Sequence, residues 1–341
     1  MNIPVYAPAA IQGVERPAIP VETPAEVLLG SKHDDSVMER RDHCPGCASS
    51  SLSSLYQESF SSSGIKNYLG RHYEGRASST ADAGAYELVS CNSCMLTFQK
   101  YVPADQLLSE IYNAWIPGTD MDRIGRNYSL DSYRNIAEQV QFFIEHFGLP
   151  PAELDVLDFG FGWAHWSRMA MGYGCQVWGV ELSQERLEHG KSVGIKVVDL
   201  ENLPSEKFRF INTEQVFEHL TKPGEILAKL AASLAKDGII KINVPNAKAS
   251  LKKLAKGSDF GALSADQQMP IAPFEHINSF TYDSLVGLGK TLGLKPMRPR
   301  FYQLYNSASG LFQIKNLVRI LARPVYRHVF PRSTFVYFVH A

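Results

Sequence analysis

The stretch 154–166, LDVLDFGFGWAHW, combines residue types that can hold a small-molecule cofactor. A short apolar run that contains Asp158 leads directly to Gly160 and Gly162, and an amphipathic segment begins at Trp163. Glycine lets the backbone approach a ligand closely, and the first turn of a helix offers unpaired N–H groups. The pattern therefore predicts a strand, a glycine turn and a helix that together form a site for a nucleoside-bearing cofactor.

Three acidic residues at the ends of predicted strands can supply the polar contacts of such a site. Glu181 ends the second strand, where an acid can accept hydrogen bonds from both ribose hydroxyls. Asp199 ends the third strand, where an acid can accept an adenine amino hydrogen, and Asp158 can help to hold a cationic amino group. Taken singly, each acid has a helix cap or a solvated loop carboxylate as its alternative. Together they favour a ligand site, because parallel sheets bind ligands at these strand ends.

NAD and FAD would compete for this site, but their G-x-G-x-x-G fingerprint is incomplete in this chain. His165 occupies the sixth position, and the third small residue is Ala164. An acid such as Asp158 also disfavours the pyrophosphate of a dinucleotide. An adenosyl cofactor with a positive sulfonium and no phosphate therefore fits the three acids better.

Four of the five cysteines form two C-x-x-C pairs, which can point their thiolates at one ion. Two such turns give the tetrahedral set of sulfur ligands that structural Zn²⁺ prefers. The 43 residues between the pairs exceed the usual zinc-ribbon separation, and Ala48 and Met95 stand where zinc knuckles often have glycine. Unmetallated thiols and a redox pair are the alternatives. We expect a structural Zn²⁺ at Cys44, Cys47, Cys91 and Cys94.

The elements that must position these residues alternate regularly from residue 156 onward. The apolar pattern predicts strands over 156–159, 176–181, 195–199, 208–212 and 239–244, with helices over 163–172, 184–191 and 224–235. Such an alternation is typical of a parallel sheet with helices on both faces. We also expect a helix over 131–147, a lid or connector over 246–280, a helix capped by Thr281, and strands over 297–304 and 334–339.

Length and composition indicate an ordinary globular protein of 341 residues, with 45% hydrophobic and 20% charged residues. The chain is long enough for one large core and a smaller module. We find no apolar run of about 18 residues and no charged start followed by an apolar core, so we expect no membrane helix, no signal peptide and a cytoplasmic location. The first 42 residues contain five prolines and no sustained apolar period, which predicts a flexible leader.

Charge is unevenly distributed along the chain, whose net charge is −1. Asp283 is the last acid, and nine cations follow it: Lys290, Lys295, Arg298, Arg300, Lys315, Arg319, Arg323, Arg327 and Arg332. Four of these recur every fourth residue from 315 and share a helical face until Pro324 interrupts it. A solvated helix face is one explanation. Recognition of a sugar-nucleotide phosphate, a lipid-linked glycan or a membrane surface is the other. The slightly acidic overall balance argues against nucleic acid.

Residues 156–245 resemble the class I S-adenosylmethionine-dependent methyltransferases. The segments VLDFGFGWAHW, VWGVELS, NTEQVFEHLTKPGEIL and DGIIKINVPN match their motifs in order, with Ala164 in place of the third glycine. PFEHINSFTYDSL and the double C-x-x-C module are similar to a subgroup that includes sugar and natural-product methyltransferases. We expect this chain to depart from the deoxysugar C-methyltransferases of that subgroup in lacking their large extra C-terminal domain. The resemblance implies an α/β, Rossmann-like seven-stranded sheet of order 3-2-1-4-5-7-6, and a cofactor site at Asp158, Gly160, Phe161, Gly162, Glu181, Leu182, Asp199, Leu200, Glu214 and Gln215.

Catalysis of methyl transfer depends on positioning, and a general base helps when a hydroxyl or an enolisable carbon is methylated. His219 and His276 are the candidates for this base, and Glu218 could orient His219 or replace it. Helix capping and loop contacts are the alternative roles of the two histidines.

The sequence thus predicts S-adenosylmethionine-dependent methylation of a small-molecule or carbohydrate-type acceptor. A NAD-dependent nucleotide-sugar enzyme and a non-catalytic scaffold remain as alternatives, and the oligomeric state is left open. We expect a leader over 1–42, a zinc-binding module and connector over 43–125, a cofactor domain over 126–246, and a C-terminal part over 247–341 that completes the sheet.

Overall fold

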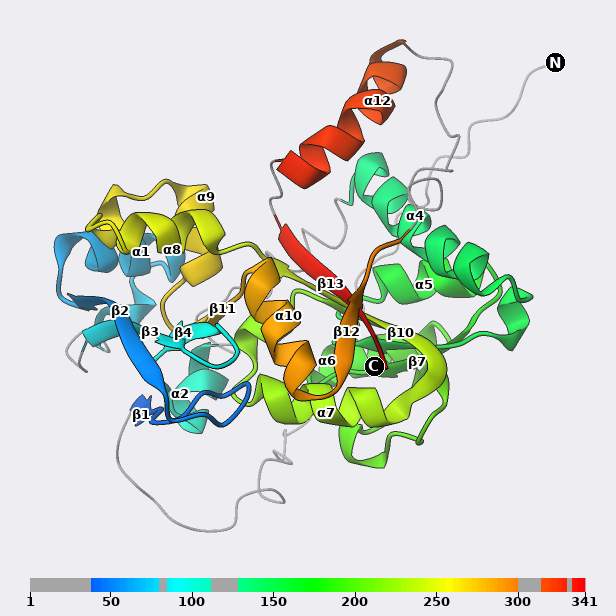
Figure 1. Cartoon of the computed structure of the whole chain (residues 1–341), viewed down its shortest axis with the longest axis horizontal. Coiled ribbons are helices and arrows are strands. Elements are labelled where there is room, and N and C mark those ends of the chain that lie inside the picture. Colours follow the sequence, from blue (N-terminus) through cyan, green and yellow to red (C-terminus); the bar gives the residue numbers. More distant parts are fainter. Residues whose placement is uncertain (1–37, 80–84, 112–127, 300–313, 330–332, 341) are drawn as a thin grey trace, which may run out of the picture. The chain divides into compact units, whose positions relative to one another are not determined.

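A computed structural model describes residues 38–79, 85–111, 128–299, 314–329 and 333–340. A seven-stranded sheet has the strand order β12-β13-β10-β9-β6-β7-β8 (Figure 1). β13 pairs antiparallel with both β10 and β12, and the remaining neighbours from β10 to β8 pair in parallel. This order confirms the 3-2-1-4-5-7-6 topology implied by the resemblance. The strands are β6 (Asp155–Phe159), β7 (Gln176–Val180), β8 (Lys196–Val197), β9 (Phe208–Glu214), β10 (Leu234–Pro245), β12 (Leu294–Met297) and β13 (Ser333–His340).

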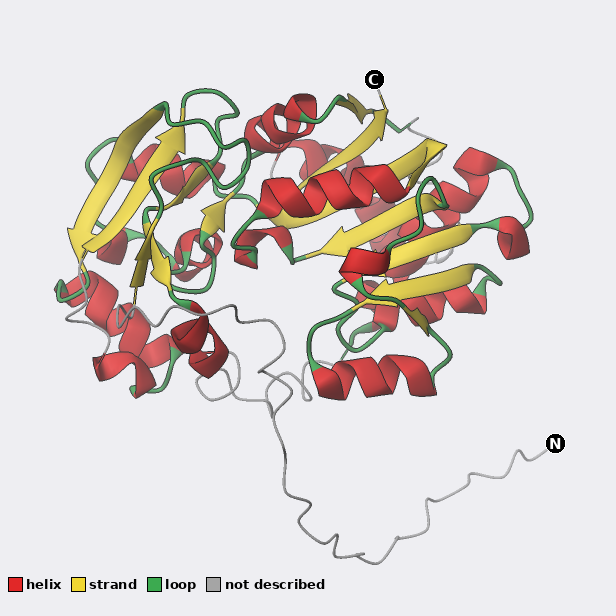
Figure 2. Ribbon diagram, turned by 90° about the horizontal axis from the view of Figure 1, so that it is seen from below, coloured by secondary structure: helices red, strands yellow, loops and turns green. Residues whose placement is uncertain are grey.

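Apolar side chains of the strands point alternately to the two faces of this sheet, and both faces are buried. Figure 2 shows the helices that flank the sheet. Neighbouring residues of β9 point to opposite sides, because Phe210 packs with Phe143 and Trp166 whereas Ile211 packs with Leu227. α4 and α5 thus supply one layer, and α7 and α10 supply the other. The helices are α4 (Leu130–Phe147), α5 (His165–Gly172), α6 (Gln184–Ser192), α7 (Pro223–Ser233), α10 (Tyr282–Thr291) and α12 (Ile314–Val329).

The N-terminal module contains a second, antiparallel sheet of order β11-β4-β3-β2 and a two-stranded ribbon of β1 and β5. β11 (Asn278–Ser279) comes from far along the chain and pairs with β4 at Phe98 and Thr97. The other elements are β1 (Met38–Arg40), β2 (Leu52–Ser59), α1 (Ser63–His72), β3 (Ala85–Cys91), β4 (Thr97–Gln99), β5 (Tyr101–Pro103) and α2 (Asp105–Glu110).

The segment 246–280, which we expected to be a lid or connector, completes the core of this module. It contains α8 (Lys248–Leu254) and α9 (Ala265–Gln268). The Phe274 ring stacks on Phe60, and Phe260 meets the edge of Tyr86. The Gln99 amide donates to the carbonyl oxygens of residues 272 and 276, at 2.9 and 3.0 Å. Residues from opposite ends of the sequence therefore share one apolar cluster.

Several predicted elements have different limits in the structure. The sequence predicts a strand over 297–304, of which residues 300–304 lie outside the described residues; the described strand is β12 at Leu294–Met297, because α10 ends at Thr291 and the left-handed Gly293 turns the chain at once into the sheet. The helix predicted over 224–235 ends at Ser233, where β10 begins. We expected Pro324 to interrupt the basic helix, but α12 continues through it. The fixed φ of proline is compatible with a helix, and the proline removes only one backbone hydrogen bond. None of the described helices combines the length and apolar character needed to cross a membrane.

Candidate active site and metal centre

The turn between β6 and α5 has an unusual backbone. Gly160, Gly162 and Ala164 all have positive φ, at 74°, 52° and 63°. A Cβ atom added at Gly160 would lie 2.5 Å from Cγ2 of Val216, so a side chain is excluded there by contact as well as by conformation. Ala164 adopts the left-handed conformation without glycine. The turn therefore brings bare backbone to the carboxyl end of β6.

Phe161 anchors the turn from below. Its buried ring packs so closely that a Cβ at Gly179 on β7 would lie 2.5 Å from it, and one at Gly190 on α6 would lie 2.6 Å from it. The Gly160 N–H also donates to the Val180 carbonyl at 2.8 Å. Because the side chain of Phe161 is enclosed by protein, its backbone is the part that can face a cofactor.

Glu181, the acid predicted to hold the ribose, lies directly against the glycine turn. Its carboxylate accepts hydrogen bonds from the backbone N–H groups of Gly162 at 2.9 Å, Leu182 at 2.9 Å and Ser183 at 3.0 Å. These bonds hold the carboxylate in place beside the turn. Since an ionised carboxylate has about four acceptor positions, capacity remains for a ligand hydroxyl.

Asp158 is the centre of a buried polar network rather than an exposed ligand. Ser167 donates to its Oδ2 at 2.7 Å, and Asn212 donates to its Oδ1 at 2.9 Å. Burial raises the pKa of Asp158 to about 6, against the opposing effect of these two bonds. Lys241 on β10 donates to Asn212 at 3.1 Å and also pairs with Glu214. Both carboxylate oxygens of Asp158 thus already have protein donors.

Sequence reasoning missed Lys241 and Asn212. The signal was present, because a lysine inside the apolar strand sequence IIKINV must have a polar partner when it is buried. The remaining predicted cofactor residues lie at the same strand ends. Asp199 is exposed before the short turn that begins at Leu200, the Leu182 side chain is 92% exposed, and Gln215 follows β9 with φ of 55°.

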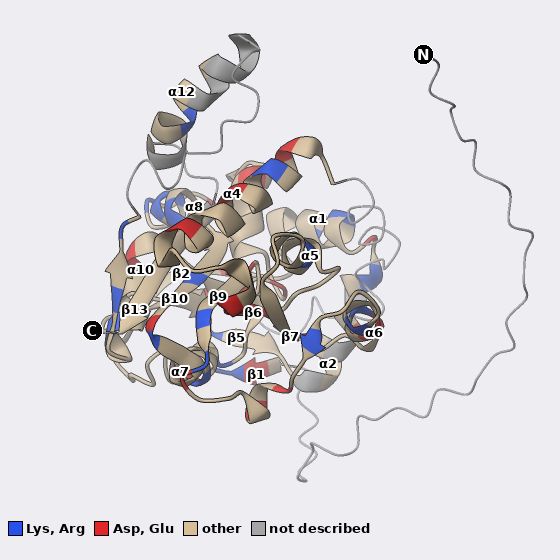
Figure 3. Cartoon of the chain, turned by 90° about the vertical axis from the view of Figure 1, so that its right-hand side faces the viewer, with Lys and Arg blue, Asp and Glu red and all other residues tan. Residues whose placement is uncertain are grey.

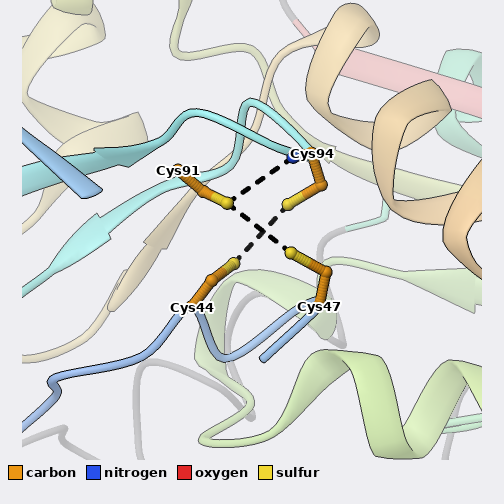
Figure 4. Close-up of side chains that lie close together, drawn as sticks. All are labelled: Cys44, Cys47, Cys91 and Cys94. Carbon is orange, nitrogen blue, oxygen red and sulfur yellow. Dashed lines mark hydrogen bonds between the residues drawn. The ribbon is translucent and has the colours of Figure 1, made fainter. Parts of the chain in front are cut away.

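The four paired cysteines come together although 43 residues separate the two pairs (Figure 4). The sulfur atoms of Cys44 and Cys94 are 3.5 Å apart, as are those of Cys47 and Cys91, and all four lie within 4.8 Å of one another. A tetrahedral zinc ion with bonds of about 2.3 Å needs sulfur atoms about 3.8 Å apart. The donor set and its spacing therefore fit Zn²⁺.

Each cysteine pair forms the same tight turn. The N–H groups of Ala48 and Met95 donate to the carbonyls of Cys44 and Cys91, at 2.8 and 3.0 Å. Both Ala48 and Met95 have positive φ, at 59° and 64°. The chain thus adopts the knuckle conformation at the two positions where glycine was missing from the sequence. A hydrogen bond from the Cys94 thiol, followed by backbone N–H groups, lowers the pKa of the Cys44 thiol against the effect of burial.

Two glycines allow these turns to pack against the helices of the large sheet. A Cβ at Gly224, in the first turn of α7, would lie 1.9 Å from the carbonyl oxygen of Gly46. A Cβ at Gly287 in α10 would lie 2.2 Å from the carbonyl oxygen of Cys94. The cysteine cluster consequently contacts the helices of the large sheet through backbone approaches that only glycine permits.

Glu218, His219 and His276, the three predicted catalytic residues, lie together. One potential ligand atom from each lies within 4.8 Å of the others. The two imidazole rings meet edge to face with centroids 4.8 Å apart, and Nε2 of His219 is 3.9 Å from Oε1 of Glu218. Nδ1 of His219 is 2.9 Å from the Glu275 carbonyl oxygen, and Nδ1 of His276 contacts the Met269 carbonyl.

Burial controls protonation in this cluster. It raises the pKa of Glu218 to about 8 and lowers the pKa of His276 to about 4, and it also lowers the pKa of His219. Burial alone would raise the pKa of Glu275 too, but a hydrogen bond from His72 and the nearby histidines lower it to about 2. The His72–Glu275 distance is 2.7 Å. Both histidines are thus neutral near pH 7.

The basic C-terminal helix is described in part. Arg323 pairs with Glu138 and Asn135 of α4. The side chains of Lys315, Arg319 and Arg327 lie outside the described residues. Val318, Leu321 and Val325 are 60%, 68% and 62% exposed. Figure 3 shows that Lys and Arg also gather on α8, in the N-terminal module.

Comparison with protein families matches residues 124–298 to a methyltransferase domain. Among solved structures, the plantazolicin methyltransferase BamL, in complex with a triazolic desmethylPZN analog and SAH, is 16% identical, with a TM-score of 0.48 over 68% of this chain and 94% of that one. The 1,6-didemethyltoxoflavin-N1-methyltransferase of Burkholderia thailandensis, with SAH bound, is 17% identical, with a TM-score of 0.39 over 60% and 86%. A comparison with curated proteins found no match.

The family match covers half of the chain and spans the whole glycine turn, Glu181 and the His219 cluster. The order of the seven strands is the one that the class I enzymes share. The chain therefore belongs to the methyltransferase-domain family and is a class I S-adenosylmethionine-dependent methyltransferase.

Proposed function

We propose that this protein methylates a small-molecule or carbohydrate-type acceptor at the carboxyl edge of the large sheet. The observation that carries the proposal is the carboxylate of Glu181, which three backbone N–H groups hold against the glycine turn. In this position it would accept the ribose hydroxyls of S-adenosylmethionine. When bound, the cofactor supplies an electrophilic methyl group.

His219 is the general base of the proposal. Its Nδ1 faces a carbonyl oxygen, which can only accept, so the proton of the neutral ring lies on Nδ1 and the lone pair lies on Nε2. Nε2 would accept the proton that an acceptor hydroxyl or carbon loses. Glu218 and His276 line the same space, where Glu218 would orient the ring and His276 would contact the acceptor.

Titration of the purified protein with S-adenosylmethionine and with NAD, followed by calorimetry, tests the cofactor. We expect binding of S-adenosylmethionine alone. Binding of NAD alone would instead support a nucleotide-sugar-modifying enzyme. The acceptor is then sought by incubating the protein with labelled cofactor and with extracts of its host. If S-adenosylmethionine binds but no extract accepts the label, a non-catalytic scaffold is favoured.

We infer that the cysteine cluster holds a structural zinc ion that stabilises the N-terminal module. The support is the tetrahedral spacing of the sulfur atoms and the two knuckle turns. Purified protein should contain stoichiometric zinc, and Cys44→Ser combined with Cys91→Ser should remove it and lower the melting temperature. Cys175→Ser is the matched control, since Cys175 is buried outside the cluster. Full stability of a metal-free preparation would contradict the inference.

We further propose that the acceptor is anionic or is presented at a membrane surface, which the cations after Asp283 would attract. Sedimentation with vesicles that contain anionic lipid, compared with neutral vesicles, separates these two cases. If the protein sediments with neither kind of vesicle, the result supports a soluble anionic acceptor.

A further inference from the structure

A second cluster of potential metal ligands lies apart from the cysteines. Glu218 and His219 follow β9 in a short 3₁₀ turn, and His276 comes from the segment before β11. From these three residues we propose that the protein binds a divalent transition-metal cation of the zinc class with one carboxylate and two imidazoles.

The carboxylate of Glu218 is the first observation behind this proposal. Glu218 is 1% exposed, and neither of its carboxylate oxygens accepts a hydrogen bond from any other described residue. The neighbouring Nε2 of His219, at 3.9 Å, is too distant for a hydrogen bond. Since a buried carboxylate requires pairing, hydrogen bonding or a metal ion, this side chain lacks the partner that its position demands.

The histidine tautomers are the second, independent observation. Each ring directs Nδ1 at a backbone carbonyl, that of Glu275 for His219 and that of Met269 for His276. Metal-binding histidines usually donate one ring N–H to such an acceptor, which fixes the ring and leaves the other nitrogen for the ion. One potential ligand atom from each ring and one from Glu218 lie within 4.8 Å of one another, and a small shift on binding would bring the three residues around one ion.

The ligand types select the kind of cation. Two imidazoles and one carboxylate suit Zn²⁺ and its neighbours in the first transition row, whereas Mg²⁺ and Ca²⁺ prefer oxygen ligands. Three protein ligands also leave a coordination position open, unlike the closed set of four cysteines.

This inference extends the proposed function and rests on it in one respect, the assignment of the lone pair to Nε2 of His219. The ion would occupy that lone pair. The metal-loaded protein would then have no general base at His219. Cation binding and proton acceptance would be mutually exclusive at this nitrogen.

The test uses the full chain with zinc already bound to its cysteines and titrates it with Co²⁺. We expect a second metal ion per chain, with weak visible absorption bands typical of nitrogen and oxygen ligands and without thiolate charge transfer. Glu218→Gln and His276→Ala should each abolish this second ion while the cysteine-bound zinc and the fold are retained. His72→Ala is the matched control, because the Nε2 of His72 is already bonded to Glu275, and it should keep the second ion.

A wild-type protein that takes up only the cysteine-bound ion would overturn the proposal, as would a second ion that survives both ligand substitutions. If one of these variants fails to fold, the conservative variant His276→Gln replaces it, and a second Co²⁺ ion that this variant retains would overturn the proposal. Calorimetry with S-adenosylmethionine on protein that carries only the cysteine-bound zinc is independent of this result. Failure to bind the cofactor would therefore contradict the proposed function without affecting the metal site.

Discussion

The substitution Gly160→Ala tests how the glycine turn is held. In the structure Gly160 has φ of 74°, and a Cβ atom there would lie 2.5 Å from Cγ2 of Val216. Gly162 provides a matched control in the same turn. It also has positive φ, at 52°, but a Cβ there would meet no atom within 4 Å.

The expected magnitudes follow from this contrast. A left-handed conformation costs an alanine roughly 1–2 kcal/mol, and overpacking in a tight contact costs about 1–3 kcal/mol. Gly160→Ala should therefore lower the free energy of unfolding by about 2–5 kcal/mol, whereas Gly162→Ala should lower it by about 1–2 kcal/mol. Combining Gly160→Ala with Val216→Ala should restore the part of the unfolding free energy that is lost to overpacking. A double-mutant cycle measures this restoration as a favourable coupling of about 1–3 kcal/mol.

Urea unfolding followed by circular dichroism gives these free energies, and calorimetry gives the affinity for S-adenosylmethionine. We expect Gly160→Ala to weaken cofactor binding as well, because the turn must move away from Val216. Equal destabilisation by the two glycine substitutions, or a double-mutant cycle without coupling, would refute the steric argument.

Three further substitutions test other parts of the site. Glu181→Ala removes the acceptor of three backbone N–H groups and should weaken S-adenosylmethionine binding at least tenfold, about 1.4 kcal/mol by calorimetry, whereas Glu185→Ala on the exposed side of α6 should not. Asp158→Asn should remove a pH dependence. Because the folded protein raises the pKa of Asp158 from 3.8 to about 6, the carboxyl group keeps its proton to higher pH in the folded state. Wild-type stability should therefore fall relative to the variant by roughly 2 kcal/mol as pH rises from about 4 to 6, and a constant difference in urea midpoints would contradict this. Gly224→Ala should lower the melting temperature and release zinc more readily, since its Cβ would lie 1.9 Å from the backbone oxygen of Gly46. Gly70→Ala, whose Cβ meets no atom within 4 Å, should have neither effect. Equal melting temperatures of the two variants would show that the turn adapts.

Local patterns were sufficient to predict the large sheet and which strand ends share one of its edges. The strand ends at Asp158 and Glu181 are adjacent in space because their strands are neighbours in a parallel sheet, which the alternation of apolar runs already implies. The pairing of Cys44 with Cys94 was predictable from ligand chemistry, since an ion relates the two turns whatever the length of chain between them.

The sequence contains no comparable signal for packing between residues that are distant along the chain. Nothing local in the sequence indicates that β11 pairs with β4 or that Phe260 packs against Tyr86. The polar network of Asp158 and Lys241 likewise depends on which strands are neighbours. The continuation of α12 through Pro324 is the opposite case. Proline is a strong local signal for the end of a helix, but the helical sequence on both sides outweighed it.

The shared core of the N-terminal module sets the order in which this protein can fold during synthesis. Phe60 and Tyr86 leave the ribosome about 170–210 residues before Phe260 and Phe274, their partners in the cluster. At 5–20 residues per second, this delay lasts roughly 10–40 s. During that interval the early half exposes aromatic surface and relies on its two cysteine turns for local order. Nascent chains that acquire metal late would therefore be the ones most exposed to aggregation and to chaperone binding.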